Sequence, residues 1–284
     1  MKAPPFAYAR VRSLSEAFDL LDQHDSAAKI LAGGQSLMPA LNMRLASPAL
    51  LIDISRLREH SGIEVKDNQI HIGALTTHAA IAESAVIRQH LPLLTDAAAH
   101  IAHPAIRNSG TLGGSLALAD PAAEWPACCV ALNAQIVLTS KTGTRRVNAR
   151  DFFQGLYTTA LLPHEIISEV VIPLPGAGYR YVFLELARRR GDYAIVGVAA
   201  LAKVQHGAIS ELRLSYLGAS NKPVYAEKTS QVIVLKGFSE NSLKEAQDTL
   251  ANELEPAADL YTAATTKLHL ARELTARALQ QLTA

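Results

Sequence analysis

Two short glycine-paired segments constrain this chain more than any other feature of its sequence. Residues 32–36 read Ala-Gly-Gly-Gln-Ser, and residues 111–115 read Thr-Leu-Gly-Gly-Ser. Glycine lets successive backbone N–H groups converge where a side chain would block them, and such a nest can hold a phosphate without a lysine. One Gly-Gly pair alone more often marks an ordinary turn. Two pairs, each beside a hydroxyl, suit the two phosphoryl groups of a pyrophosphate, so we expect a phosphate-bearing ligand.

Neither segment matches the common phosphate-binding motifs. The Walker A loop ends in Gly-Lys followed by Ser or Thr, and the Rossmann fingerprint is GxGxxG. Both glycine pairs depart from these patterns, which argues against P-loop and Rossmann folds. The first pair follows a short apolar run at residues 29–32, so we expect it to lie directly after a β-strand.

Length and composition indicate a globular protein of more than one unit. The chain has 284 residues, and domains usually span roughly 100–200 residues, so two or three units are expected. Hydrophobic residues make up 49% and charged residues 19%, which argues against extended disorder. The formal net charge is +1, so nucleic acid is not an expected partner. The one tight basic run, residues 188–190, is interpreted either as solvated surface or as a ligand or subunit contact.

The chain carries no signal for a membrane or for disulfide chemistry. No stretch reaches the roughly 18–20 uncharged apolar residues that cross a bilayer, and the first residues lack the apolar core of a signal peptide. We therefore expect a cytoplasmic protein without a membrane span. Cys128 and Cys129 are adjacent, which makes a disulfide between them improbable and cannot supply the four thiolates of an iron–sulfur cluster. Buried packing is their expected role.

Hydrophobic periodicity predicts a mixture of helices and strands. Ser13 and Glu16 have the spacing of a capping box, so a helix should begin there. Further helices are predicted at residues 37–45, 77–83 and 86–102, and in the tail. Strands are predicted at residues 29–32, 50–54, 63–65, 69–72, 135–139, 167–172, 180–186, 198–205 and 209–217. Turns at Asp67-Asn68 and His206-Gly207 should form hairpins. The tail has one apolar stripe, formed by Leu260, Ala264, Leu268, Ala271, Leu274, Ala278 and Leu282.

Residues 173–178 concentrate proline and glycine and mark the best domain boundary in the chain. The expected units are residues 1–55, 56–174 and 175–284. The first should be a small α/β lobe and the second an α+β domain. The third should be an antiparallel sheet with helices, which makes the fold class α+β.

Two longer motifs surround and follow the second glycine pair. Residues 106–115 read Ile-Arg-Asn-Ser-Gly-Thr-Leu-Gly-Gly-Ser, and Asp120-Pro121 and then Glu124 follow. Residues 191–194 read Gly-Asp-Tyr-Ala. With the first glycine segment, these motifs resemble the signatures of the FAD-binding medium subunit of the molybdenum hydroxylases, the family of carbon monoxide dehydrogenase, quinoline oxidoreductase and xanthine dehydrogenase. The likeness covers nearly the whole chain.

The resemblance implies that FAD is the cofactor, that residues 1–55 form an FAD-binding lobe and that the central domain is of the PCMH type. Both glycine loops would wrap its pyrophosphate and donate from Gly33, Gly34, Gln35, Ser36, Thr111, Gly113 and Gly114. Glu124 would bind the adenosine ribose, unless it is simply a solvent-facing carboxylate. Tyr193 would pack beside the isoalloxazine, unless it is a core aromatic. Leu161 and Leu162 resemble an apolar pair near the flavin ring, although any buried strand end would look the same. The remaining implied contacts are Lys29, Leu31, Ala32, Leu37, Ile101, Ala102, Ser115 and Ala117.

The chain also departs from the family pattern. Many members carry Asn or Asp where Ser115 stands, so that hydrogen bond should be shorter-reaching or water-mediated. A lysine that some relatives place before Gly-Asp-Tyr is replaced here within residues 184–186, so the flavin potential could differ. With only two cysteines, the chain cannot hold the iron–sulfur loop of the benzoyl-coenzyme A reductase branch.

The implied function is an oxidoreductase component, an electron-transfer flavoprotein subunit with no catalytic side chain and no metal site of its own. His71, His78, His100 and His103 lack metal-ligand spacing and are interpreted as structural. The implied partners are a large molybdopterin-binding subunit and a small subunit with two [2Fe-2S] clusters, assembled as a heterohexameric dimer of heterotrimers. An external acceptor, expected to be a quinone, a cytochrome or oxygen rather than NAD, would take the electrons. A self-contained FAD oxidoreductase and a scaffold that has lost FAD are the alternatives.

Overall fold

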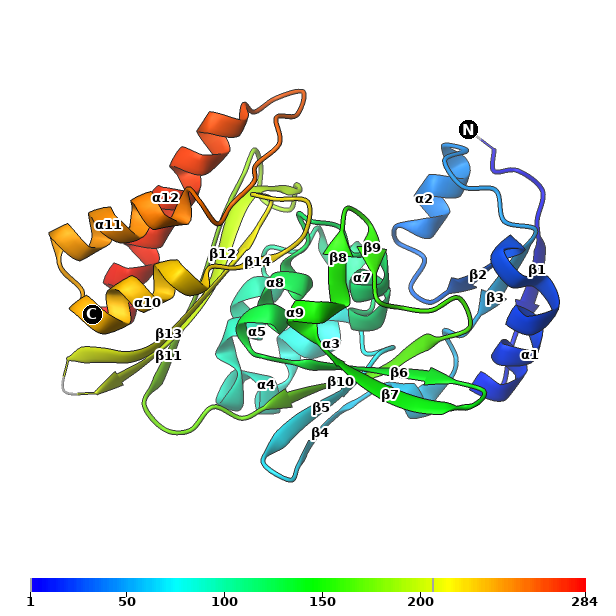
Figure 1. Ribbon diagram of the computed structural model, residues 1–284. Helices are drawn as coiled ribbons and strands as arrows, with labels where there is room; N and C mark the ends of the chain where they lie inside the picture. The colour runs from blue at the N-terminus through cyan, green and yellow to red at the C-terminus, as the bar shows by residue number, and fades with distance from the viewer. Residues whose placement is uncertain (1, 206) are drawn as a thin grey trace.

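The structure is a computed structural model that describes residues 2–205 and 207–284. Three units follow one another along the chain and lie in that order across the molecule, from the blue N-terminal lobe to the orange and red C-terminal helices (Figure 1). Each unit has its own β-sheet, of three, five and four strands, and a two-stranded ribbon is added in the middle unit. Within these described residues, the structure contains no helix with the length and apolar character needed to cross a bilayer.

The N-terminal lobe is a small parallel sheet covered by one helix. Its elements are β1 (Ala7–Arg10), α1 (Leu14–His24), β2 (Ala28–Leu31), α2 (Leu37–Asn42) and β3 (Leu50–Asp53). The strand order is β1-β3-β2, and both pairings are parallel. Ala17, Phe18 and Leu21 of α1 are buried on this sheet. The Ser13 hydroxyl accepts from the Glu16 N–H at 3.2 Å, which confirms the predicted N-cap.

The central domain is an antiparallel sheet in the order β4-β5-β10-β6-β7. Its strands are β4 (Ile63–Lys66), β5 (Gln69–Gly73), β6 (Gln135–Ser140), β7 (Gly143–Asn148) and β10 (Ile166–Pro173), and β8 (Phe153–Gly155) and β9 (Thr158–Thr159) form the separate ribbon. Asp67 and Asn68 have φ of 50° and 58°, which suits the primed turn of a tight hairpin and confirms the one predicted there. The β7 edge strand was missed because its polar, mostly exposed residues give no buried face.

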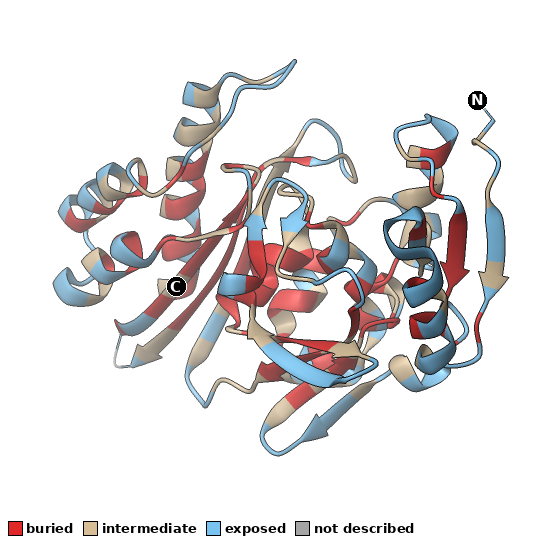
Figure 2. Cartoon of the chain, turned by 45° about the vertical axis from the view of Figure 1, so that its right-hand side comes forward, coloured by how far each residue is buried: buried red, intermediate tan, exposed pale blue. Residues whose placement is uncertain are grey.

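Helices cover one face of this sheet and supply most of the central core (Figure 2). They are α3 (His78–Glu83), α4 (Ala85–His90), α5 (Pro92–Ala98), α6 (Pro104–Arg107), α7 (Leu112–Leu118), α8 (Glu124–Ala131) and the single turn α9 (Ala149–Phe152). The single helix predicted at 86–102 is wrong: Pro92 has no N–H to continue α4, so it begins α5 instead. α8 is buried from Trp125 to Ala131, so it shows no amphipathic period to predict.

The C-terminal sheet lies between the central helices and a second helical layer. It is antiparallel, in the order β11 (Tyr179–Ala187), β12 (Ala194–Gln205), β13 (Ala208–Leu217) and β14 (Val224–Tyr225), followed by α10 (Glu227–Lys236), α11 (Glu240–Leu250) and α12 (Ala264–Thr283). β12 and β13 pair as predicted, although His206 of their turn lies outside the described residues. Val198 and Ala200 join the C-terminal core, whereas Ala199 and Leu201 join the central core. Such two-sided burial makes the strands almost uniformly apolar. The stripe on α12 is buried as predicted at its later positions, but Leu260 precedes the helix and is 92% exposed.

Candidate cofactor-binding site

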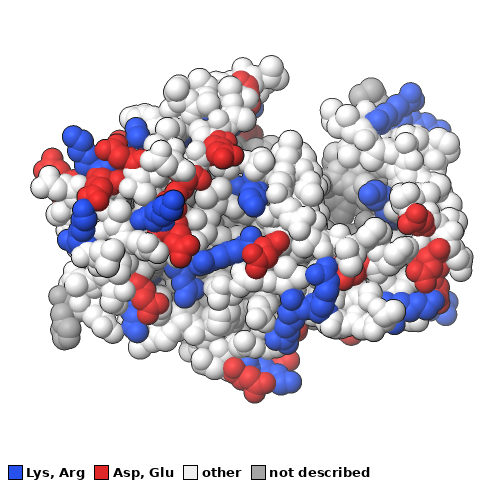
Figure 3. Space-filling view, in the orientation of Figure 1, with Lys and Arg blue, Asp and Glu red and all other residues white. Residues whose placement is uncertain are grey.

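The two glycine-paired loops meet between the N-terminal lobe and the central domain. A Cβ atom placed on Gly33 would lie 2.1 Å from the carbonyl oxygen of Ser109 and 2.8 Å from Cα of Gly110. No side chain therefore fits at residue 33 without separating the loops. A hollow separates the lobe on the right from the rest of the molecule (Figure 3). Long-range folding has thus joined two segments that are about eighty residues apart in sequence.

The first loop offers unused backbone donors. It leaves β2 at Leu31, turns through Gly34 with φ of 71°, and enters α2. Among the residues that the structure describes, no protein acceptor takes the N–H groups of residues 33–36. The Gln35 side chain donates to the Gly33 carbonyl at 2.9 Å, which fixes the turn. Consecutive free N–H groups beside a positive-φ glycine form the kind of nest that binds phosphate.

The second loop is organised differently. The N–H of Gly113 donates to the Ala74 carbonyl at 2.8 Å, and the N–H of Gly114 donates to the Thr111 hydroxyl at 3.1 Å. A Cβ atom on Gly113 would lie 2.6 Å from Cβ of Ala74. The N–H groups of Gly113 and Gly114, two of the three donors expected of this loop, are therefore already used within the chain. Its glycines serve close packing. Gly114 and Ala117 lie on the exposed face of α7, and a Cβ atom placed on Gly114 would lie 4.0 Å from Cβ of Ala32.

His78 supports the second loop from behind. Its backbone N–H donates to the Gly110 carbonyl at 3.0 Å, and its Nδ1 accepts from Nε1 of Trp125 at 2.8 Å. Burial, and after it the nearby Arg107 guanidinium, lower the pKa of His78 to about 4. The imidazole is therefore neutral near pH 7, as its role as acceptor requires. Arg107 in turn donates to the carbonyl oxygens of Ile101 and Ala102 at 2.8 and 3.0 Å.

Two interacting acids, the half-buried Glu124 and the buried Glu185 side chain, follow the second loop in the sequence. Burial raises the pKa of Glu124, the first residue of α8, to about 8, and the Glu185 carboxylate contributes to the rise. The side chain of Glu185 is only 2% exposed, and burial raises its pKa to about 7. Glu124 is half-buried in the folded chain. It holds a proton near pH 7 and can donate to, as well as accept from, a hydroxyl. Sequence reasoning treated Glu185 only as the replacement of a lysine and missed its burial.

Exposed aromatic and apolar side chains border the same region. Tyr193 directly precedes β12 and is 77% exposed, so it is not a core aromatic. Tyr157 is 56% exposed, and its hydroxyl donates to Asp120 at 3.4 Å. Leu162 is exposed, whereas Leu161 packs against the central core. Tyr157 was missed because the sequence gives no signal for its contact with Asp120, which is 37 residues away.

The remaining predicted residues divide into two groups. Ala32, Ser36 and Leu37 belong to the first loop or begin α2, and Ser115 lies on α7. Lys29 and Leu31 lie on β2, where Lys29 is exposed.

Cys128 and Cys129 are free and buried as predicted. Within residues 2–205 and 207–284, no cluster of His, Cys, Asp and Glu could hold a metal ion.

Comparison with known proteins identifies the class of this site. Residues 4–175 match the family described as the FAD-binding domain in molybdopterin dehydrogenase, and residues 181–282 match the C-terminal domain of the carbon monoxide dehydrogenase flavoprotein. These matches define an FAD-binding component of an oxidoreductase. The chain belongs to the family of FAD-binding medium subunits of the molybdenum hydroxylases, and FAD is its cofactor. The resemblance and the mixed helix-and-sheet fold inferred from the sequence are thus confirmed.

Individual relatives cover nearly the full chain. The 6-hydroxypseudooxynicotine dehydrogenase complex subunit alpha of Paenarthrobacter nicotinovorans is 38% identical, with 98% of this chain and 95% of the relative covered. The carbon monoxide dehydrogenase structure from Hydrogenophaga pseudoflava superposes with a TM-score of 0.97 at 36% identity and covers 99% of this chain and 98% of its own. Quinoline 2-oxidoreductase from Pseudomonas putida 86 gives 0.94 at 35% identity, with 100% and 98% covered.

Proposed function

We propose that this chain is the electron-transfer subunit of a molybdenum hydroxylase complex. In this proposal it receives electrons from the [2Fe-2S] clusters of a small partner subunit and passes them to an external acceptor. A large molybdopterin-binding subunit would oxidise the substrate, and the assembly would be a dimer of heterotrimers. Support comes from relatives named as medium chains or as subunits of dehydrogenase complexes. A cytoplasmic location, expected from the sequence, is part of the same proposal.

The observation that carries the proposal is the nest of free N–H groups at residues 33–36, set against the second glycine loop. These donors would hold the FAD pyrophosphate at the boundary of the two lobes. Glu124, which is protonated near pH 7, would exchange hydrogen bonds with the adenosine ribose. Tyr193 and Leu162 would border the ring system, because both are exposed where an apolar planar group could cover them. FAD, when bound, supplies the redox chemistry, and the chain supplies its position and electrostatic surroundings.

Cys128, Cys129 and His78 are engaged in packing. Burial raises the pKa of Cys129 to about 12 and also raises the pKa of Cys128 well above its usual value, so neither is a thiolate near neutral pH. His78 is buried and accepts from Trp125. This arrangement favours electron transfer over covalent or acid–base catalysis by the protein.

Surface charge and the exposed tyrosine bear on the partners. The face in Figure 3 intermixes Lys and Arg with Asp and Glu and presents no large single-sign field, which fits protein partners better than a nucleic acid.

Tyr193 is exposed enough to cover one side of a flavin. We infer that the acceptor is a quinone, a cytochrome or oxygen rather than NAD. Robust NAD reduction by the assembled complex would contradict this inference.

Purification of the full chain with and without its partners tests the proposed function. The partners would be the products of adjacent genes for a molybdopterin protein and a two-cluster iron–sulfur protein. We expect a yellow protein that oxidises no organic substrate alone and gains dye-reducing activity only in the assembled complex. Turnover by the isolated chain would instead indicate a self-contained oxidoreductase. A colourless chain that stays colourless with added FAD and partners would refute the proposal.

A further inference from the structure

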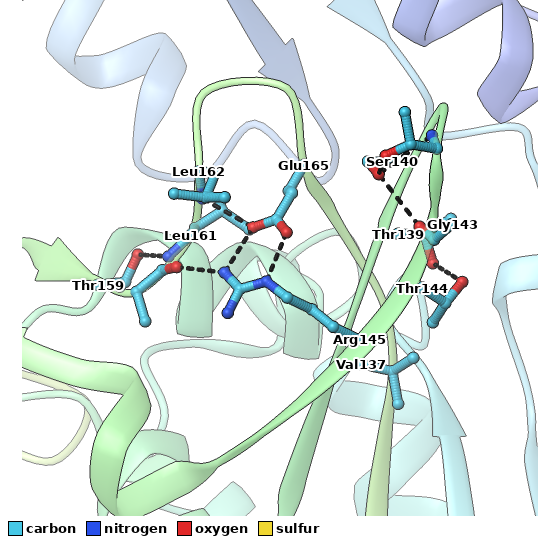
Figure 4. Close-up of polar contacts among 12 residues, drawn as sticks. Val137, Thr139, Ser140, Gly143, Thr144, Arg145, Thr159, Leu161, Leu162 and Glu165 are labelled. Atoms are coloured by element: carbon cyan, nitrogen blue, oxygen red, sulfur yellow. Dashed lines mark hydrogen bonds and ion pairs between the residues drawn. The ribbon is translucent and has the colours of Figure 1, made fainter.

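One ion pair in the central domain, between Arg145 and Glu165, stabilises the turn formed by residues 160–165. The Arg145 side chain reaches from β7 to Glu165, with Nε 2.6 Å from Oε1 and Nη2 2.8 Å from Oε2 (Figure 4). The geometry is bidentate, which is the strongest arrangement of this pair. The Glu165 side chain is only 7% exposed. The guanidinium lowers the pKa of Glu165, so this carboxylate stays charged near neutral pH.

The same two side chains bind the backbone of the turn formed by residues 160–165, here called the leucine turn. Nη2 of Arg145 donates to the Ala160 carbonyl at 2.6 Å, and Oε2 of Glu165 accepts from the Leu162 N–H at 2.8 Å. The Glu165 N–H donates back to the Leu162 carbonyl at 3.0 Å. The turn is therefore fixed at both ends by charge-assisted hydrogen bonds.

The leucine turn lies at the seam between the two lobes. Leu161 packs against the central core, whereas Ile166, one residue after the turn, belongs to the core of the N-terminal lobe. Nδ1 of His164 is 3.4 Å from the Asp22 carboxylate on α1. A segment that contacts both lobes is placed to fix their separation, and the paired glycine loops meet across the same boundary.

Leu162 is the unexplained member of this turn. Its backbone is held rigidly, but its side chain is 57% exposed. Single exposed leucines are common and usually need no explanation. An exposed leucine on a turn fixed by a buried carboxylate is different. Burying a carboxylate costs desolvation free energy, and that cost indicates that the position of the turn matters.

We propose that Arg145 and Glu165 are positioning residues that fix the leucine turn so that Leu162 presents a rigid apolar contact to the ring system of bound FAD. The inference rests on the proposed function and extends it to two residues that do not touch the cofactor. The ion pair acts through the Leu162 N–H and the Ala160 carbonyl, and the leucine side chain makes the contact. Loss of the pair therefore has the same effect on the flavin as loss of the leucine side chain.

A double-mutant cycle in the full chain tests this coupling. The variants are Glu165→Gln, Leu162→Ala and their combination, and the readouts are the FAD dissociation constant and the visible circular dichroism of bound FAD. Leu162→Ala changes an exposed side chain and should fold normally. Lys236→Gln is the matched control, because it removes an ion pair with the same 2.6 Å separation, to Glu245 between α10 and α11.

We expect each single change to weaken FAD binding about tenfold and the double variant to be little weaker than either, because coupled residues are not additive. The dichroism of bound FAD should change in the same way in Glu165→Gln and in Leu162→Ala. Arg145→Lys should retain part of the FAD binding, and the control Lys236→Gln should match the wild type. Unchanged affinity and dichroism in Glu165→Gln, or effects that multiply in the double variant, would overturn the inference while leaving the proposed function intact. Failure of the wild-type chain to bind FAD even with its partners present would overturn the proposed function itself.

Discussion

Replacing Gly33 by alanine is the smallest change that should separate the two glycine loops. The added Cβ atom would begin 2.1 Å from the Ser109 carbonyl oxygen, and the three atoms nearest to it are all backbone atoms that no rotamer change can move. Real Cβ contacts essentially never fall below 3.0 Å. The loops must therefore move apart by about 0.9 Å before the variant can fold.

This displacement should act on the cofactor more than on folding. Overpacking of this kind costs about 1–3 kcal/mol, which most proteins survive because their total stability is about 5–15 kcal/mol. A misplacement of roughly 1 Å in a positioned site costs on the order of 100-fold. We therefore expect the FAD dissociation constant of Gly33→Ala to rise about 100-fold, which is about 2.7 kcal/mol of binding free energy.

The assay is the ratio of FAD to protein after desalting, followed by titration with FAD under flavin fluorescence. Gly176→Ala is the matched control, because nothing lies within 4 Å of its added Cβ atom. Urea unfolding of both variants separates loss of the cofactor from loss of the fold. If Gly33→Ala holds FAD with wild-type affinity while folded, contact between the loops does not form the site.

Three further predictions concern ionisation. The pKa of His78 is about 4 in the folded chain and ordinarily 6.5, so the stability linked to neutral His78 is complete above about pH 6.5 and is lost as the pH falls towards 4. Fluorescence of Trp125, the single tryptophan, should follow this loss, and an unchanged acid midpoint in His78→Asn would contradict it. The pH dependence of stability linked to Glu124 has the opposite sign. Because the pKa of Glu124 is raised from 4.5 to about 8, the FAD-free chain should lose stability as the pH rises through that range. Glu124→Gln should remove this loss, so that the variant is more stable than the wild type at pH 8 in urea unfolding, and equal pH dependence of the two proteins would refute the assignment. Finally, Cys128 and Cys129 should resist thiol reagents at pH 7 until the chain unfolds, because both are buried with raised pKa values; rapid labelling of the native protein would exclude that packing.

Local sequence patterns predicted those elements of the fold whose signal is local. The cap at Ser13, the hairpin around Asp67 and Asn68 and the paired strands β12 and β13 were all found from spacing and turn chemistry. The failures have identifiable causes. α8 is buried on every side and β7 is exposed on an edge, so neither alternates between apolar and polar residues. Pro92 divides a helical pattern that periodicity alone reads as continuous.

The candidate site was only partly accessible to sequence reasoning, because its decisive features are long-range contacts. The glycine motifs located both loops, but only the structure reveals that Gly33 touches Ser109 and that the Gly113 N–H is already bonded to Ala74. The burial of Glu185 and the bonds from Arg145 to Glu165 likewise depend on pairing between distant strands and turns. No spacing rule within one segment could have indicated them.

The central claim is that this chain passes electrons from an iron–sulfur partner through bound FAD. The most direct test mixes the flavin-loaded chain anaerobically with the chemically reduced two-cluster partner subunit, freed of excess reductant, and follows visible flavin absorption in a stopped-flow instrument. We expect rapid bleaching of the flavin in the wild-type chain and in Gly176→Ala. Gly33→Ala should lose this bleaching together with its FAD. Flavin that stays oxidised beside a reduced, correctly assembled partner would contradict it.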